Sequence, residues 1–338
     1  MPLGQDTADK IRAPEAKPAD PVQLPAGETG QLELIKKDYK SLDKPVKAGL
    51  LLAGYKGILL LPYLLDYPGI DILFISSYKV RGTRDNSSKI IKETCREKEI
   101  DYIPRKSLNG DAFKDVDRVF VVGWQYLIDE CDDKFVVLHD SYLPELRGWC
   151  PTVTALLSGK KYLGATGFVP DEGMDTGPIY SRHKIPITYP IKLEEAYKKV
   201  AEGYSVIIKE IIEDELFPDY SLQDESQGNI ASYSIWRGPE DMFIDWSMDA
   251  EYIKRFVDAL GFPFTGAKTR YDGREIVVEE VEVLAGKYKF ELNQPGKIFN
   301  INGNQPLVLC GDGLIKITRA SEANGEPAVF DRLKVRLV

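Results

Sequence analysis

Short runs of apolar and β-branched residues recur along residues 46–190 and predict the strands of a sheet. Clusters of Gly, Pro, Asn and Ser bound these runs, which is typical of strands buried on both faces. The predicted strands are Lys47 to Ala53, Ile70 to Ser76, Asp101 to Ile103, Arg118 to Val122, Phe135 to Leu138, Tyr162 to Val169 and Ile179 to Ile187. Helical patterns follow several of them, so we expect a Rossmann-like α/β domain with a mostly parallel sheet.

The second half of the chain has a different pattern. Leu193 to Glu213 has helical periodicity and closes the first domain, predicted over residues 46–215. Residues 216–231 are polar with Pro and Gly, which predicts a linker. Residues 232–338 contain a predicted helix and then four short strand-like runs separated by Gly and Asn turns. This spacing predicts a small OB-like β-barrel.

Composition limits the class of protein. At 338 residues the chain is longer than one typical domain, so two domains are expected. We expect residues 1–45 to form a disordered extension, because the N-terminal segment is rich in Pro, Ala, Asp and Lys and lacks the apolar stretch of a signal peptide. Ala48 to Leu65 is apolar, but Gly54, Lys56 and Pro62 interrupt it, so a strand, turn and helix explain it better than a membrane span.

The net charge and the cysteine content indicate which kinds of partner and which cellular compartment to expect. The net charge of −9 weighs against a protein whose main task is nucleic-acid binding, although a local basic patch can lie on an acidic protein. The four cysteines show no CxxC spacing, and only two histidines are present, so neither a metal site nor a disulfide framework is indicated. We expect a reduced, cytoplasmic protein without membrane association.

Two ionisable residues are candidates for chemistry. His139 follows the apolar run Phe135 to Leu138, and Asp175 lies in a Gly-rich turn after the run Tyr162 to Val169. Ligands of open α/β sheets collect at the carboxyl ends of strands. An imidazole beside a carboxylate can shuttle a proton or stabilise a developing oxyanion. A capped structural histidine is the alternative, and the two residues by themselves leave both open.

The stretch around these residues carries a longer motif. It contains, in order, His139, Ser141, Leu143, Pro144, Arg147, Gly148, Gly164, Thr166 and Asp175-Thr176-Gly177. This pattern resembles the formyltransferase family that uses 10-formyltetrahydrofolate. The resemblance implies that His139 and Asp175 are catalytic and that 10-formyltetrahydrofolate is the formyl donor, without a metal.

The same resemblance implies binding residues. Folate contacts are expected at Gly123, Trp124, Tyr126, Leu143, Asp171 and Gly173, and acceptor contacts at Ser141, Pro144, Arg147 and Gly148. For the aromatic residues, a packing corner without a ligand is an open alternative. One position departs from the family pattern, since Val137 stands where the family has a catalytic asparagine. Another donor such as Gln125, a backbone N–H or a water replaces that amide, or the chemistry is altered or lost.

The second half carries two further resemblances. The segment from Ser232 to Trp246 is similar to the linker of sugar-nucleotide N-formyltransferases, and the barrel is similar to the C-terminal domain of methionyl-tRNA formyltransferase. We therefore expect Tyr233, Trp236 and Arg237 to contact an acceptor, with a nucleotide-linked amino sugar as the first candidate. Methionyl-tRNA is the alternative acceptor, and a folate-binding homologue without turnover is the other alternative. A homodimer is left open.

Overall fold

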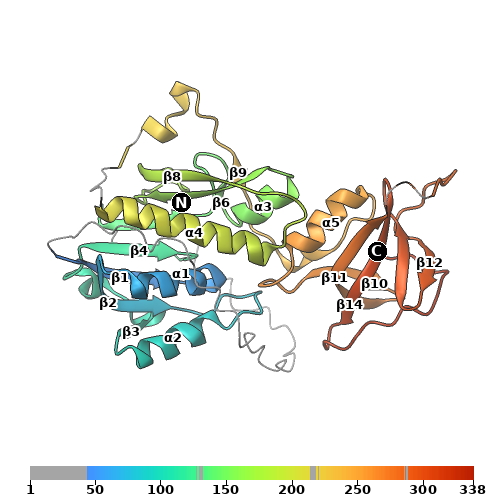
Figure 1. Ribbon diagram of the computed structural model, residues 1–338, viewed down its shortest axis with the longest axis horizontal. Coiled ribbons are helices and arrows are strands. Elements are labelled where there is room, and N and C mark those ends of the chain that lie inside the picture. The colour runs from blue at the N-terminus through green and yellow to red at the C-terminus, as the bar shows by residue number, and fades with distance from the viewer. Residues whose placement is uncertain are drawn as a thin grey trace, which may run out of the picture.

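The computed structural model describes residues 44–338, except residues 127, 129–131, 214–217, 220, 285 and 287. Figure 1 shows an α/β part followed by a β part, with helix α5 (Ala250–Ala259) between them. The predicted extension lies almost entirely outside the described residues. The fold-class prediction is confirmed by a mostly parallel sheet followed by an antiparallel five-stranded sheet.

Seven strands form the first sheet. Their spatial order is β3 (Asp101–Pro104), β2 (Ile70–Ser77), β1 (Val46–Leu52), β4 (Arg118–Val122), β5 (Phe135–His139), β7 (Tyr162–Phe168) and β8 (Ile179–Pro186). β3 to β5 are parallel, whereas β7 is antiparallel to β5 and β8 is antiparallel to β7. The central apolar runs are buried on both faces because helices and loops cover both of them.

Helices cover one face of this sheet, and an aromatic cluster covers the other. α1 (Gly54–Asp66), α2 (Ser87–Glu97) and α4 (Leu193–Glu213) pack on the first face, and α3 (Pro151–Leu157) follows the loop after β5. On the second face, Phe113 of the short 3-10 helix Gly110–Phe113 packs against Phe74 and Phe135. Successive residues of β5 therefore point into different clusters, which separates Val137 and His139 from Leu138.

The β part consists of five antiparallel strands. Their order is β10 (Ala267–Tyr271), β11 (Arg274–Leu284), β14 (Leu314–Glu322), β13 (Gln305–Leu309) and β12 (Ile298–Asn302). Backbone groups of the last two residues of the chain form hydrogen bonds at both edges of this sheet. Val338 exchanges two backbone hydrogen bonds with Arg270 of β10, and Leu337 N donates to Gly296 O just before β12. The C-terminal segment thereby satisfies backbone groups at both edges of the sheet.

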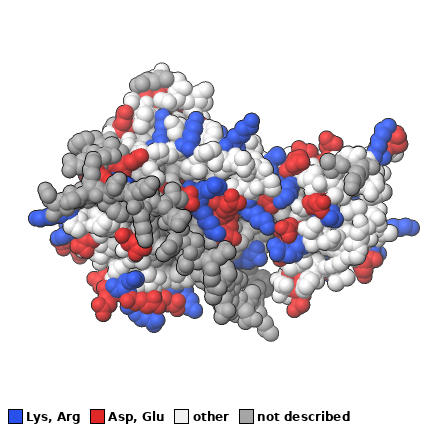
Figure 2. Space-filling model, viewed as in Figure 1, with Lys and Arg blue, Asp and Glu red and all other residues white. Residues whose placement is uncertain are grey.

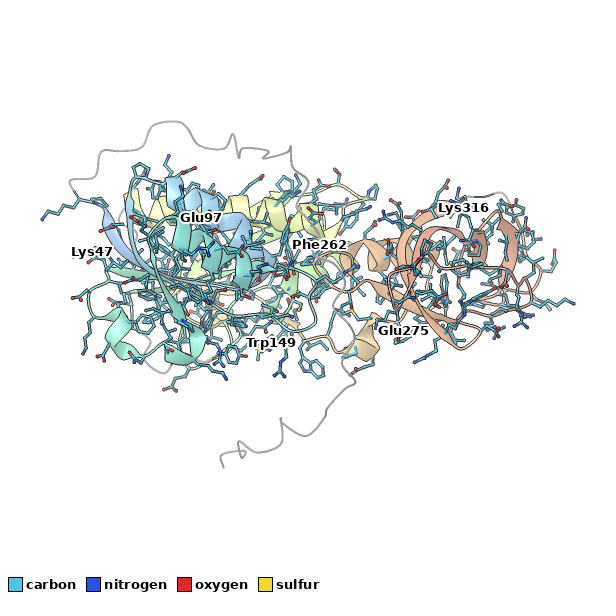
Figure 3. All side chains as sticks on the ribbon, turned by 90° about the horizontal axis from the view of Figure 1, so that it is seen from below. Lys47, Glu97, Trp149, Phe262, Glu275 and Lys316 are labelled. Atoms are coloured by element: carbon cyan, nitrogen blue, oxygen red, sulfur yellow. The ribbon has the colours of Figure 1, made fainter. Side chains whose placement is uncertain are left out.

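The two parts share a continuous apolar core. α5 (Ala250–Ala259) packs against α3 on one side and β11 on the other. Phe262, which Figure 3 shows near the junction, meets Tyr55 of α1 edge-on at a centroid distance of 4.9 Å. No helix in the described part of the chain is both long enough and apolar enough to cross a bilayer.

The segment between the parts returns to the loop after β5. It contains two 3-10 helices, Ser221–Gln223 and Glu225–Gln227, and the short strand β9 (Tyr233–Ser234). β9 pairs in parallel with β6 (Arg147–Gly148). The predicted linker, residues 216–231, thus leads into a strand that touches the candidate site.

Candidate active site

His139 is the last residue of β5 and lies at the carboxyl end of the parallel strands. The residue is 7% exposed, and its Nε2 is 3.1 Å from the carbonyl oxygen of Leu146. A carbonyl oxygen only accepts, so Nε2 must carry a proton in this arrangement. The other ring nitrogen, Nδ1, is therefore the atom that can gain or lose a proton.

Asp175 faces that second nitrogen. Its Oδ2 is 3.6 Å from His139 Nδ1 and accepts a 2.6 Å hydrogen bond from the backbone N–H of Gly148. Asp175 has a positive φ of 54° in the Gly-rich turn after β7, which turns its carboxylate back toward β5. The structure thus brings His139 and Asp175 together, with the carboxylate facing Nδ1.

Gly148 connects this pair to β9. Arg147 N donates to Ser232 O and Trp149 N donates to Ser234 O, so the loop after β5 runs alongside β9. Gly148 has a φ of +98°, and a Cβ there would lie 2.5 Å from Ser234 O. Only glycine allows the two segments to lie this close, because a side chain would displace β6 or β9.

Arg147 is buried in a network instead of facing solvent. Its Nε and Nη2 donate to Gln223 Oε1, and its Nη1 donates to Glu225. Gln223 in turn donates to the backbone oxygens of Asp175 and Gly177. Gln223 and Glu225 bind the guanidinium of Arg147 in the structure, and its contact with an acceptor stays a prediction. Sequence patterns missed Gln223, which has no motif signal.

The other loop residues of the motif lie mostly beneath the site. Leu143 is fully buried with Phe168 and Ile179, and Pro144 follows it through a cis peptide bond. The hydroxyl of Thr166 donates to Ser141 O at 2.6 Å, while the buried Oγ of Ser141 has no hydrogen-bond partner among the described atoms. The side chain of Leu143, expected to contact folate, therefore supports the loop from the core.

An aromatic corner lies at the end of β4. The rings of Trp124 and Tyr126 both meet Tyr78 edge-on, at centroid distances of 5.0 and 4.9 Å. Burial raises the pKa of Tyr78 to about 12, and its hydroxyl accepts from Gln125 N. Gly123 starts this turn with a positive φ, where a Cβ would collide with Ala53 O. The corner is packed on its inner side, while Tyr126 is 46% exposed on its outer side.

Asp171 and Gly173, the remaining expected folate contacts, form an exposed turn. Asp171 Oδ1 accepts from Gly173 N at 3.0 Å and from the hydroxyl of Thr176 at 2.7 Å. These bonds shape the chain just before Asp175. In the structure these residues are part of the turn that carries the carboxylate.

Val137 lies on the same face of β5 as His139 and is half-buried. It packs against a cluster containing Val121 and Phe135 and against a second cluster of Leu143, Phe168 and Ile179. Both neighbourhoods are apolar. Valine is therefore a well-packed residue at the position where the resemblance expects an amide.

Two of the expected acceptor residues, Tyr233 and Trp236, lie on an exposed apolar rim. We define the rim as Trp149, Met174, Tyr233, Ile235 and Trp236, which are 39 to 73% exposed. Figure 3 shows Trp149 on the lower side of the α/β part. Trp149 follows Gly148, Met174 precedes Asp175, and β9 supplies Tyr233, so the rim borders the His139 and Asp175 pair. Arg237 is half-buried beside it.

Asp140, which sequence analysis did not single out, forms a buried ion pair with Lys56 of α1. Its Oδ2 also accepts from the hydroxyl of Thr152 at 2.6 Å. Burial alone would raise the pKa of Asp140, but the Lys56 ammonium and then the charge on His139 lower it to about 2.

This low pKa predicts a contribution to acid stability. Because the folded pKa lies below the unfolded value of 3.8, the stabilisation is present above pH 4 and lost as the pH falls toward 2. We expect it to be on the order of 2 kcal/mol. Urea unfolding of wild type and Asp140→Asn between pH 7 and 2 measures it. Parallel stability curves for the two proteins would contradict the assignment.

The Cys150 thiol also bears on the chemistry. Burial, followed by the charge of Asp140, raises the pKa of the Cys150 thiol, which disfavours a thiolate nucleophile. In the described ranges no cluster of three or more His, Cys, Asp or Glu residues could hold a metal ion.

Comparisons with known proteins found two matching family models. The family model "Formyl transferase" matches residues 83–212, and "Formyl transferase, C-terminal domain" matches residues 238–331. The methionyl-tRNA formyltransferase of Finegoldia magna is 27% identical over 279 residues, which are 78% of this chain and 88% of that protein. The Clostridium beijerinckii enzyme of the same name is 30% identical over 58% of this chain and only 61% of its own length.

Solved structures share the fold. HypX from Aquifex aeolicus superposes with a TM-score of 0.56 at 16% identity, over 85% of this chain and 48% of that chain. WlaRD, a sugar 3N-formyl transferase, superposes with a TM-score of 0.55 at 16% identity, over 83% of this chain and 99% of that one. At these identities the likeness concerns the fold alone.

Proposed function

The chain belongs to the formyl transferase family, and on that premise we propose that it transfers a formyl group from 10-formyltetrahydrofolate to a primary amine. The observation that carries the proposal is the approach of His139 Nδ1 to Asp175 Oδ2, 3.6 Å apart at the carboxyl end of β5. An acid–base pair at this edge suits an acyl transfer in which both charge and protons must move.

His139 and Asp175 have separate roles in this proposal. The amine nitrogen bonds to the formyl carbon, and the C=O π electrons move to the oxygen. His139, protonated on Nδ1, donates to that oxygen as the charge develops, while Asp175 stabilises the imidazolium. The bond from the formyl carbon to the donor nitrogen then breaks. That nitrogen gains a proton, and the attacking amine loses one, so the formamide and the deformylated donor are both neutral at the reacting nitrogens.

The walls of the site fit a flat, partly apolar donor. Val137 contributes an apolar surface beside His139, and Tyr126 presents a half-exposed ring with the Arg105 guanidinium 3.8 Å from its centroid. A pterin ring gains from contact with such surfaces. We therefore place the donor between β5 and the corner formed by Tyr78, Trp124 and Tyr126.

Methionyl-tRNA is the first acceptor to test. The relatives from F. magna and C. beijerinckii are both methionyl-tRNA formyltransferases. The exposed rim beside Asp175 can take an apolar aminoacyl side chain and the terminal base of an RNA. Figure 2 shows basic side chains intermixed with acidic ones over one face, so electrostatic attraction of an RNA backbone would be local.

A nucleotide-linked amino sugar is the second candidate. The exposed rings of Tyr233 and Trp236 offer stacking faces, and Arg237 follows directly with a guanidinium that suits a phosphate. The net charge of −9 also favours a small acceptor over a long polyanion.

Parallel assays with each acceptor distinguish the two candidates. The purified protein is given 10-formyltetrahydrofolate with methionyl-tRNA or with a panel of amino-sugar nucleotides, and formylated product is measured by mass spectrometry at two salt concentrations. Salt-sensitive formylation of methionyl-tRNA supports the first acceptor, and formylation of a nucleotide sugar alone replaces it with the second. Folate binding without any product would overturn catalysis and favour a binding homologue.

Val137→Asn tests whether an amide is missing. Because Val137 packs against two apolar clusters, we expect the asparagine to lower the free energy of unfolding by about 1–3 kcal/mol. We also expect no rise in kcat, since the amide enters a site built around valine. Val137→Ala is the control for lost packing. A kcat at least tenfold above wild type in Val137→Asn would show that the site lacks a donor.

A further inference from the structure

Gln223 is a buried amide of the linker that contacts both loops of the candidate site. It ends the 3-10 helix Ser221–Gln223 and is 6% exposed. Its Nε2 donates to the carbonyl oxygens of Asp175 and Gly177, at 3.1 and 2.6 Å. Its Oε1 accepts from Nη2 and Nε of Arg147, at 2.8 and 3.1 Å. One side chain therefore joins the turn that carries the carboxylate to β6.

The partners of this amide fix its orientation. Carbonyl oxygens only accept hydrogen bonds and a guanidinium only donates them, so the NH2 group must face the turn and the amide oxygen must face Arg147. A glutamate in place of Gln223 keeps an acceptor for Arg147 but puts a second carboxylate oxygen against two carbonyl oxygens. The two ends of the amide can therefore be tested separately.

The turn needs restraint because Asp175 has an uncommon backbone conformation. Its φ of +54° lies in the left-handed region, which residues other than glycine seldom adopt. Gln223 binds the carbonyl oxygen of Asp175, and the N–H of Gly148 binds its carboxylate at 2.6 Å. These two bonds restrain the residue at its backbone and at its side chain. Oδ2 is thereby kept 3.6 Å from His139 Nδ1, slightly beyond hydrogen-bond length.

Further contacts keep the linker helix in place. Arg182 of β8 donates from Nη1 to Leu222 O at 3.1 Å and also to Leu143 O in the loop after β5. The side chain of Leu222 packs against the apolar cluster that contains Leu143. The position of Gln223 therefore depends on how the linker lies on the loop after β5.

We propose that Gln223 is a positioning residue for formyl transfer, which sets the place of Asp175 relative to His139 when the linker is docked on the loop after β5. This inference rests on the proposed function. Because the four hydrogen bonds of its buried amide all go to the protein, Gln223 acts on the reaction through Asp175. Its loss should therefore lower kcat and leave the KM of the formyl donor unchanged.

Hydrogen exchange at Gly148 tests this positioning without an activity assay. The Gly148 N–H is bonded to Asp175 Oδ2, whereas the Trp149 N–H is bonded to Ser234 O. In residue-resolved NMR of the full chain, we expect Gln223→Glu to speed exchange of the Gly148 N–H at least about tenfold and that of the Trp149 N–H less than about threefold. An unchanged Gly148 rate would overturn the proposal. Equal increases at both residues would also overturn it, because they would show that β9 has left β6.

The kinetics of two variants test the two ends of the amide. Gln223→Glu keeps the contact with Arg147, while Gln223→Met removes both ends at similar side-chain length. We expect kcat at least about tenfold below wild type in both variants, with the KM of the formyl donor within about twofold. A kcat within about twofold of wild type in Gln223→Glu would overturn the proposal, because the bonds to the turn would then be dispensable. If wild type formylates no acceptor, the proposed function fails, and exchange of the Gly148 N–H still decides the role of Gln223.

Asn304 provides a matched amide in the β part. Its Nδ2 donates to Ala328 O at 2.6 Å and its Oδ1 accepts from Phe330 N at 2.8 Å, so both ends of this amide are also bonded to the backbone. Asn304→Asp makes the same change from amide to acid, and we expect it to lower Tm while kcat stays within about twofold of wild type. A loss of kcat equal to that of Gln223→Glu would show that general loosening of the fold suffices, and it would overturn the proposal.

Discussion

His139→Gln is expected to lower kcat for formyl transfer by a factor of about 10²–10⁴. Glutamine can still donate to Leu146 O, so the loop after β5 keeps its contact. It cannot take a proton at the place of Nδ1, and Asp175 then faces no imidazole. Steady-state kinetics with a saturating formyl donor measures the effect.

His183 provides the matched control. It lies in β8, where its Nε2 is 2.9 Å from Glu210, and this hydrogen bond raises its pKa. His183→Gln changes the other histidine of the chain at a place outside the site and is expected to leave kcat within about twofold of wild type. Comparable losses in the two variants would show that His139 has no special role.

Gly148→Ala is expected to lower kcat at least about tenfold and to destabilise the fold by about 1–3 kcal/mol. The added Cβ would lie 2.5 Å from Ser234 O at a φ of +98°, so β6 must move away from β9. That movement takes the Gly148 N–H away from Asp175 Oδ2. Enzyme kinetics and urea unfolding together measure both effects.

Gly273→Ala controls for the strain of a positive φ. Gly273 has a φ of +80° in the turn between β10 and β11, and a Cβ there meets nothing within 4 Å. We expect a similar strain and an unchanged kcat. If Gly148→Ala behaves like Gly273→Ala, the contact between Gly148 and Asp175 does not position the carboxylate.

Much of the first sheet was predictable because its apolar runs are short, buried and bounded by turn residues. The predicted strand Arg118 to Val122 and the helix Leu193 to Glu213 have the same bounds in the structure. β10 was missed, since its alternation of Ala267, Thr269 and Tyr271 with two basic residues spans only one short strand. β6 and β9 were also missed, because two-residue strands have no sequence pattern of their own.

Some residues of the candidate site could likewise be predicted from the sequence, and others could not. Motif spacing pointed to His139 and Asp175, and the structure brings them together. Gln223 and Lys56 were found only in the structure. Arg147 and Gln223 are 76 residues apart in the chain, and Lys56 and Asp140 are 84 residues apart. Pairing over such distances depends on how the elements pack, which a local pattern does not contain.

By itself the sequence determined most strands of the first sheet, the fold class and the place of the histidine at a strand end, because hydrophobic periodicity and turn residues act over a few neighbouring positions. Only the tertiary structure showed that β9 pairs with β6 in the loop after β5. It also showed that Arg147 donates hydrogen bonds to Gln223 and that Asp140 forms an ion pair with Lys56. These contacts join residues that share no local signal, and they arise because burying a polar group requires a partner from whichever element packs beside it.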